Sequence, residues 1–295
     1  MSRTPFPQPV RLVAQPPRQP PTQHITTSSP PPSPTTPTHN IGPEMPPHPE
    51  TTPVPSSFPA MSPSRNPKTS PAPPSQDFTL PKLRLEIRDV THAGAHLVFT
   101  TVNASETITT AARNVLRHLY ASPSCPTTTA PPTRSVTLIL RSMPGVAYTT
   151  GIELDNDHKE VHLSLDHVAN TSRERTGPEI TGVITHELVH CLQWNGFGTC
   201  PGGLVEGVAD WVRLQCHLAP PHWKKEAAEK WDAGYQHTAY FLDHLEAKVG
   251  HGFVRRLNEK LRIERYEEET FWVELTGRTV GDLFADYVKS LQAGQ

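Results

Sequence analysis

The residues best suited to chemistry in this sequence are two histidines four positions apart, with a glutamate directly after the first, in the segment ITHELVH. On a helix, residues four apart lie on one face, so His186 and His190 can present imidazole nitrogens to a single metal ion. Glu187 is rotated by about 100° around the helix axis, which suits it to act on a water molecule instead of joining the ligands. The HExxH spacing therefore predicts two zinc ligands and one general base.

A catalytic zinc site needs a third protein ligand and one open position. The pattern HExxHxxGxxH, with a third histidine, fails because position 193 is Gln and position 196 is Gly. A carboxylate from the following helix is the other solution, and Glu206 and Asp210 both fit because they are four residues apart on the helix expected at 204–218. We expect Glu206 to be the ligand and Asp210 to accept a hydrogen bond from a ligand imidazole, and the reversed roles are the alternative.

Hydrolysis through such a site also needs a group that stabilises the tetrahedral oxyanion. Tyr235, His237 and Tyr240 follow the metal motif, and Tyr235 is the catalytic candidate, although a Tyr in a helix more often packs in the core. Asp166 and His167 lie about twenty positions upstream on a separate element, so we expect them at the surface or outside the first ligand shell.

The elements that must position these residues change in type along the chain. Strands are predicted first, at 83–90, 96–102 and 135–143 and as a pair within 146–168 around the turn DNDHKE, with one helix at 105–122 that Ser105 would cap. Helices follow, starting after Pro178 with the HExxH helix and continuing at 204–218, 234–249, 252–263 and 279–291, where Thr279 is the expected cap. This order predicts an α+β, zincin-like domain with a small N-terminal mixed sheet and a helical C-terminal half. The segment EVHLSLDHV (160–168) is the candidate strand for binding a substrate backbone.

Composition separates the first part of the chain from the rest. Residues 1–78 hold 24 of the 34 prolines in the 295-residue chain. The same segment has only 8 charged residues. Such a segment buries too little apolar surface to offset its chain entropy, so we expect a disordered tail with polyproline II character. Residues 79–295 are expected to form the folded domain.

Charge and hydropathy exclude several classes of function. The net charge is −2, with no dense Lys/Arg block, so no nucleic-acid partner is expected. No apolar run approaches 18 residues and no signal peptide is visible, so we expect no membrane span and, by default, a cytoplasmic monomer.

The four cysteines form no CxxC pair, which favours small buried thiols over a zinc knuckle or disulfides.

The stretch HELVHCLQWNGFGTCPGGLVEGVADWVRL resembles the basic secretory proteins of plants, a family of HExxH peptidases with bacterial and fungal relatives. The likeness continues in PPHW (220–223), WDAGYQHTAYFLDHL (231–245) and TGRTVGDLFADY (276–287), and covers most of residues 80–295. It implies a secreted, zinc-dependent endopeptidase domain. His186 and His190 match that family's zinc ligands, Glu187 its catalytic glutamate, and Glu206 and Asp210 its EGIAD acids. This chain is neither basic nor visibly secretory, so an extracellular location rests on the resemblance alone.

Two functions are compatible with these features. The first is a zinc-dependent endopeptidase acting on a peptide or protein substrate, in which Glu187 activates the attacking water. The alternative is a non-catalytic zinc-binding module whose Pro-rich tail, through runs such as PPSP and PAPP, recruits SH3-type or WW-type domains. Glu187 discriminates between them, because a structural zinc site has no use for a general base.

Overall fold

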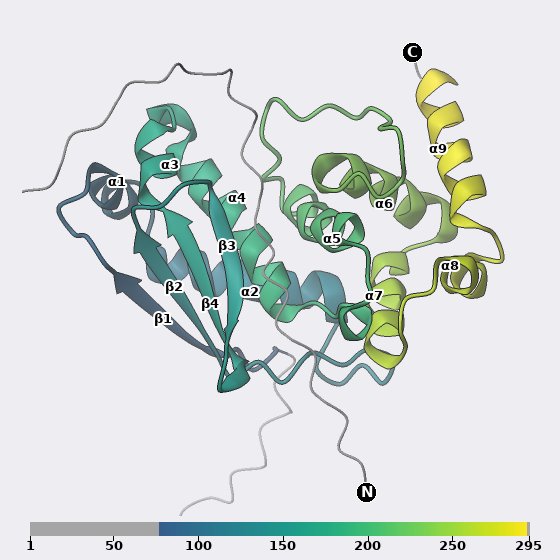
Figure 1. Ribbon diagram of the computed structural model, residues 1–295, viewed down its shortest axis with the longest axis horizontal. Coiled ribbons are helices and arrows are strands. Elements are labelled where there is room, and N and C mark those ends of the chain that lie inside the picture. Colours follow the sequence, from purple (N-terminus) through teal and green to yellow (C-terminus); the bar gives the residue numbers. More distant parts are fainter. Residues whose placement is uncertain (1–76, 294–295) are drawn as a thin grey trace, which may run out of the picture. The chain divides into compact units, whose positions relative to one another are not determined.

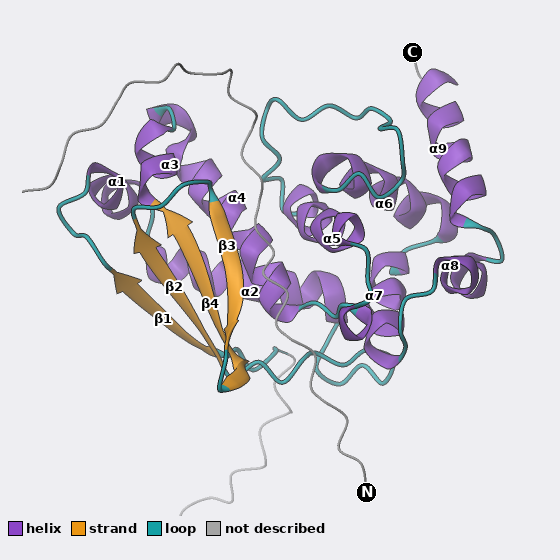
Figure 2. Ribbon diagram, viewed as in Figure 1, coloured by secondary structure: helices purple, strands orange, loops and turns teal. Residues whose placement is uncertain are grey.

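The computed structural model describes residues 77–293, which form an α+β structure with the strands in the first half and most helices in the second (Figures 1 and 2). The α+β expectation is confirmed for this part of the chain, and the Pro-rich tail predicted for 1–78 lies outside it except for its last two residues. The strands are β1 (Lys82–Ile87), β2 (Ser135–Arg141), β3 (Ala147–Ile152) and β4 (Asp155–Ser164); the helices are α1 (Ala93–Thr101), α2 (Ala104–Tyr120), α3 (Leu165–Asn170), α4 (Arg173–Leu192), the 3-10 helix η1 (Gly196–Gly198), α5 (Gly202–Gln215), α6 (Tyr235–Val249), α7 (Phe253–Ile263), α8 (Glu268–Thr276) and α9 (Val280–Ala293).

The four strands form a mixed sheet in the order β1-β2-β4-β3. β1, β2 and β4 run parallel, and β3 pairs antiparallel with β4 at one edge. The central strands are largely buried. Leu138 of β2 and its partner Val161 of β4 are each 2% exposed and belong to the core that includes residues of α2 and α4. The predicted mixed sheet is therefore confirmed.

The sheet order overturns the expectation that β4 binds a substrate strand. β4 lies between β2 and β3, so its backbone groups are already paired on both sides. β3, at the end of the order, has one unpaired edge within the described sheet. A sequence period shows that a segment is a strand, whereas the neighbours of that strand depend on long-range pairing.

Several local predictions were also wrong. The segment 96–102, expected as a strand, lies mostly in helix α1, which packs on α3 so closely that a Cβ at Gly94 would meet the Leu165 backbone. This tertiary contact outweighs the β propensity of HLVFTT. All six residues of the expected turn DNDHKE belong to β4, and helix α2 is capped by Asn103 instead of Ser105. Helix α4 begins before Pro178, and α8 was not predicted.

The helical half packs around α4 and α5, which run antiparallel to each other, and α6 lies along α5 (Figure 1). The α5–α6 approach requires glycine, because a Cβ at Gly207 would lie 2.3 Å from the Thr238 side chain and one at Gly203 would lie 1.8 Å from the Asp232 carbonyl oxygen. As a result, the first turn of α6 lies beside the first turns of α5. The predicted cap of α9 is confirmed, since the Thr279 hydroxyl accepts from the Asp282 backbone at 3.2 Å. In residues 77–293, no helix is long and apolar enough to cross a membrane.

Candidate functional site

Helix α4 carries the two motif histidines on one face, one turn apart, as its 3.6-residue period requires. Their Nε2 atoms lie 3.1 Å apart, and their rings meet edge to face with centroids 4.8 Å apart. Both imidazoles are largely enclosed, with 11% of the His186 side chain and 6% of the His190 side chain exposed. Two nitrogens converging in a sheltered position form half of a metal site.

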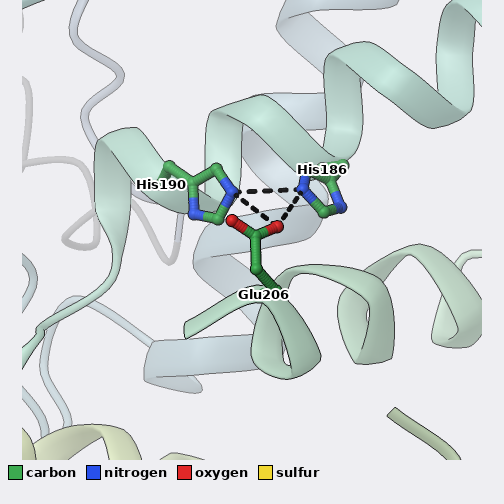
Figure 3. A group of neighbouring side chains, drawn as sticks. All are labelled: His186, His190 and Glu206. Atoms are coloured by element: carbon green, nitrogen blue, oxygen red, sulfur yellow. Dashed lines mark hydrogen bonds and ion pairs between the residues drawn. The ribbon is translucent and has the colours of Figure 1, made fainter. Parts of the chain in front are cut away.

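Helix α5 brings Glu206 to the same point (Figure 3). Its Oε2 lies 3.1 Å from Nε2 of His186 and 3.6 Å from Nε2 of His190. Tetrahedral zinc with ligand bonds of about 2.0–2.1 Å spaces its ligand atoms about 3.3–3.4 Å apart, so these separations suit one ion. His186, His190 and Glu206 offer ligand atoms within 4.8 Å of one another, and the cluster could bind a metal.

Asp210 lies one turn further along α5, outside this cluster. Its Oδ1 is 2.7 Å from Nδ1 of His186, and its side chain is 4% exposed. An ionised carboxylate can only accept, so the Nδ1 of His186 carries a proton and its Nε2 faces Glu206 and His190. On the second ring, Nδ1 of His190 lies 2.8 Å from the side-chain amide of Gln193. Each imidazole is thus oriented through the nitrogen that points away from the cluster.

The electrostatics of the cluster favour a bound cation. Burial disfavours a charged His186, but the Asp210 carboxylate and the Glu206 hydrogen bond outweigh it and raise the pKa of His186 to about 10. Burial likewise opposes the charge on Glu206, yet the hydrogen bonds from His186 and His190 hold its pKa well below the ordinary value. With Glu187 nearby, three carboxylates face two imidazoles, an arrangement that a divalent cation would stabilise.

Glu187 directs its carboxylate to the sheet side of α4 and is 5% exposed. Its Oε2 accepts a hydrogen bond of 2.6 Å from the Thr149 hydroxyl, which comes from the edge strand β3. The same hydroxyl lies 3.1 Å from the Glu187 carbonyl oxygen. Glu187 is therefore beside the His–His–Glu cluster but bonded to a different element.

Tyr235, the predicted oxyanion stabiliser, is the first residue of α6. Its ring lies nearly parallel to that of His186, with centroids 6.2 Å apart, and 42% of the residue is exposed. Its φ of +47° is strained for a residue other than glycine, and such strain is concentrated at functional sites. Burial and the charges of Glu206, Asp210 and Glu187 raise the pKa of Tyr235 to about 12. The phenol thus stays protonated near neutral pH and can donate a hydrogen bond.

The other residues considered from the sequence lie elsewhere. Asp166 accepts from the Ser142 hydroxyl and the Met143 backbone, and His167 lies 3.3 Å from Glu179, so neither joins the cluster. Tyr240 contacts Trp223 edge to face. All four cysteines, Cys125, Cys191, Cys200 and Cys216, are free thiols. The expectation that they are buried holds for Cys191 alone, because the other three are partly exposed.

Two residues at the site were missed from the sequence, Thr149 and Gln193. Thr149 is 38 positions before Glu187, on a strand whose neighbours were unknown, so nothing local pointed to it. Gln193 was recognised only as the residue that breaks the three-histidine pattern. Its position three residues after His190, near one helical turn, was the available signal that it could reach that ring.

The comparisons with known proteins agree with this geometry at the level of the family. The searches of curated proteins and of solved structures returned no match. A family model described as BSP, peptidase of plants and bacteria, matches residues 80–287, which span the sheet, the His–His–Glu cluster and the helical half. The chain therefore belongs to the basic secretory protein family of peptidases.

Proposed function

We propose that this protein is a zinc-dependent endopeptidase with a zincin-like active site. The observation that carries the proposal is the convergence of two imidazole nitrogens and one carboxylate, from α4 and α5, next to the carboxylate of Glu187. Membership in a peptidase family supports hydrolysis of peptide bonds as the reaction.

The donor set supports zinc as the metal and His186, His190 and Glu206 as its ligands. Two histidines and one glutamate, with a fourth position left for water or substrate, are the ligands of several zinc peptidases. A zinc ion held here would polarise the scissile carbonyl and lower the pKa of a bound water. Asp210 would keep His186 in the orientation and tautomer that ligation needs, and Gln193 would hold the ring of His190 in position.

The remaining residues perform the proton transfers and stabilise charge. Glu187 takes the proton of the attacking water and delivers it to the amine that leaves. Tyr235, whose pKa stays near 12, donates its phenolic hydrogen bond to the oxygen that becomes negative in the transition state. Its place over His186 at the exposed side of the cluster suits this role, because substrate must enter from solvent.

The free edge of β3 is the best support for a peptide substrate. An extended peptide can add to an unpaired strand edge through main-chain hydrogen bonds, which do not depend on the identity of its side chains. β3 contacts α4, so a peptide on this edge would pass close to Glu187. The substrate strand is thus proposed for β3, not for β4.

The first test compares wild type with Glu187→Gln on an unfolded protein such as casein. We expect wild type to bind about one zinc per chain, to hydrolyse casein and to lose this activity to a chelator. Glu187→Gln should keep its zinc and lose between about 10²- and 10⁴-fold in kcat, the usual contribution of a general base. The control is Glu174→Gln, an exposed acid at the start of the same helix, which should retain full activity.

The same test addresses the non-catalytic zinc module. If wild type binds zinc tightly but does not hydrolyse casein, and Glu187→Gln changes nothing, the result supports the non-catalytic zinc-binding module and refutes the peptidase proposal. If the Glu187→Gln variant were fully active, Glu187 would not be the general base.

A further inference from the structure

The hydrogen bond between Thr149 and Glu187 connects the edge of the sheet to the proposed base. The hydroxyl lies 2.6 Å from Glu187 Oε2, a distance typical of a strong O–H···O⁻ bond. A threonine hydroxyl has one hydrogen to donate. The carboxylate oxygen Oε2 of Glu187 is a nearer acceptor for it than the Glu187 carbonyl oxygen, which lies at 3.1 Å. One carboxylate oxygen of Glu187 is thus occupied, and the other remains for water.

The backbone of Thr149 faces the free edge of the sheet. In an antiparallel pair, residues alternate between those that bond to the partner strand and those that point away from it. Val146 bonds to the partner, since its carbonyl accepts from the Ser164 backbone at 2.9 Å in the register that pairs Thr149 with Val161. By alternation Tyr148 also faces β4, while the N–H and C=O of Thr149 point outward.

We infer that Thr149 is a positioning residue that couples substrate binding to the catalytic base. Its backbone would bond to a peptide added to the β3 edge, and its hydroxyl holds the carboxylate that acts on that peptide. The inference rests on the proposed peptidase function, and it concerns the part of that function in which Glu187 is oriented relative to the substrate.

Orientation of Glu187 matters because a terminal carboxylate rotates easily. The last torsion of a glutamate side chain is broad and two-fold, so packing alone does not select one plane for its oxygens. A short hydrogen bond to Oε2 selects that plane and leaves Oε1 in a fixed direction. A displacement of about 1 Å in a reacting group can cost about 100-fold in rate. Loss of the hydroxyl should therefore reduce kcat more than it affects KM.

The test compares Thr149→Val, Thr149→Ser and Thr150→Val in the full chain. Valine keeps the β-branched shape and removes the hydroxyl, whereas serine keeps the hydroxyl. Thr150 is the matched control, because it is the next residue of β3, its side chain faces the opposite side of the sheet, and its hydroxyl bonds only to the Gly151 carbonyl at 3.2 Å.

We expect Thr149→Val to lose between about 10- and 100-fold in kcat on a short peptide, with KM changed by less than about 3-fold. Thr149→Ser should stay within about 3-fold of wild type because it keeps the donor. Thr150→Val should be unchanged. The zinc content and the melting temperature of all three should match wild type, and a crystal structure of Thr149→Val should show the Glu187 carboxylate turned away from its wild-type plane.

Each other outcome overturns the inference. A Thr149→Val enzyme with wild-type kcat, or with Glu187 in its original plane, would show that the hydroxyl is not needed. Loss of zinc or a lower melting temperature in this variant would assign Thr149 a structural role instead. Equal losses in Thr149→Val and Thr149→Ser would point to packing. Wild type that does not cleave peptides would overturn the proposed function together with the inference, whereas an active wild type with any of the results above overturns the inference alone.

Discussion

At the scale of single residues, each imidazole of the site is oriented by the side chain that contacts its Nδ1. The nitrogens that converge on Glu206 are set by partners on the opposite side of each ring, Asp210 for His186 and Gln193 for His190. Asp210 and Glu206 both carry a carboxylate and lie one turn apart on α5, so residue type alone did not separate a ligand from a hydrogen-bond acceptor. In the structure, Glu206 faces Nε2 of His186 and Asp210 faces its Nδ1.

This difference predicts how metal binding responds to substitution. Asp210→Asn removes the carboxylate that accepts from His186, a proposed ligand, and such a change typically costs about 10- to 100-fold in metal affinity. Glu206→Ala removes a proposed ligand and should cost more than about 100-fold, since the donor itself is lost. The zinc affinity of both variants is measured by competition with a chelating dye. A greater loss in Asp210→Asn than in Glu206→Ala would mean that the two acids exchange roles.

At the scale of elements, the site depends on how α4 and α5 are held against each other. Glu179 of α4 lies 3.1 Å from Arg213 of α5, at positions seven residues from His186 and from Glu206 respectively. Arg213 also donates to the Leu218 carbonyl and lies so close to α4 that a Cβ at Gly182 would come within 2.6 Å of its Nε. His167 of α3 lies 3.3 Å from the same glutamate. This ion pair fixes one end of the contact between α4 and α5, and the His–His–Glu cluster lies toward the other.

Glu179→Gln should therefore weaken the fold and change its response to acid. Breaking this partly buried pair should lower the free energy of unfolding by about 3 kcal/mol, the low end for buried pairs because 18% of the Glu179 side chain is exposed. The hydrogen bond from His167, followed by the charges of Arg213 and Arg175, holds the pKa of Glu179 at about 2 instead of 4.5. A lowered pKa stabilises the fold above about pH 4.5, and this stabilisation is lost as pH falls toward 2.

Urea unfolding measured at several pH values between 2 and 7 tests this prediction. Wild type should lose stability more steeply between about pH 4.5 and 2 than Glu179→Gln, because only wild type takes up a proton at this position on unfolding. Glu174→Gln, which changes an exposed acid of the same helix, should alter the free energy of unfolding by less than about 0.5 kcal/mol. Parallel pH curves for wild type and Glu179→Gln would contradict the prediction.

The limits of sequence reasoning also lie at the scale of elements. The HExxH helix, α5, α6, α7 and α9 could be predicted because their apolar residues repeat with the helical period, and α9 also has a local cap in Thr279. The helical conformation of 96–101 and the central position of β4 could not, because each depends on a neighbour distant in sequence. Thr149 was missed for the same reason, since its contact with Glu187 follows from the pairing of β3 at the sheet edge.

At the scale of the described molecule, one hydrophobic core extends from Ala95 in α1 to Tyr287 in α9. It joins the sheet half, which provides Thr149, with the helical half, which provides Glu206 and Tyr235. The family match covers almost the same span, residues 80–287. We therefore propose that the chain from residue 77 onward folds as one domain that contains the whole site.

A fragment of residues 77–295 tests this proposal. It should melt within about 3 °C of the full chain, bind zinc equally and cleave casein at the same rate, because a difference below about 1 kcal/mol shifts the melting temperature of a domain this size by only a few degrees. A second fragment that ends at Gly277 removes α9 and with it Tyr287, which is 0% exposed and packs 5.7 Å from Phe241. Loss of one buried aromatic side chain costs about 3–5 kcal/mol, so this fragment should melt at least about 10 °C lower or fail to fold. If the 77–295 fragment were destabilised as strongly as the one without α9, residues before 77 would have to be counted as part of the folded domain.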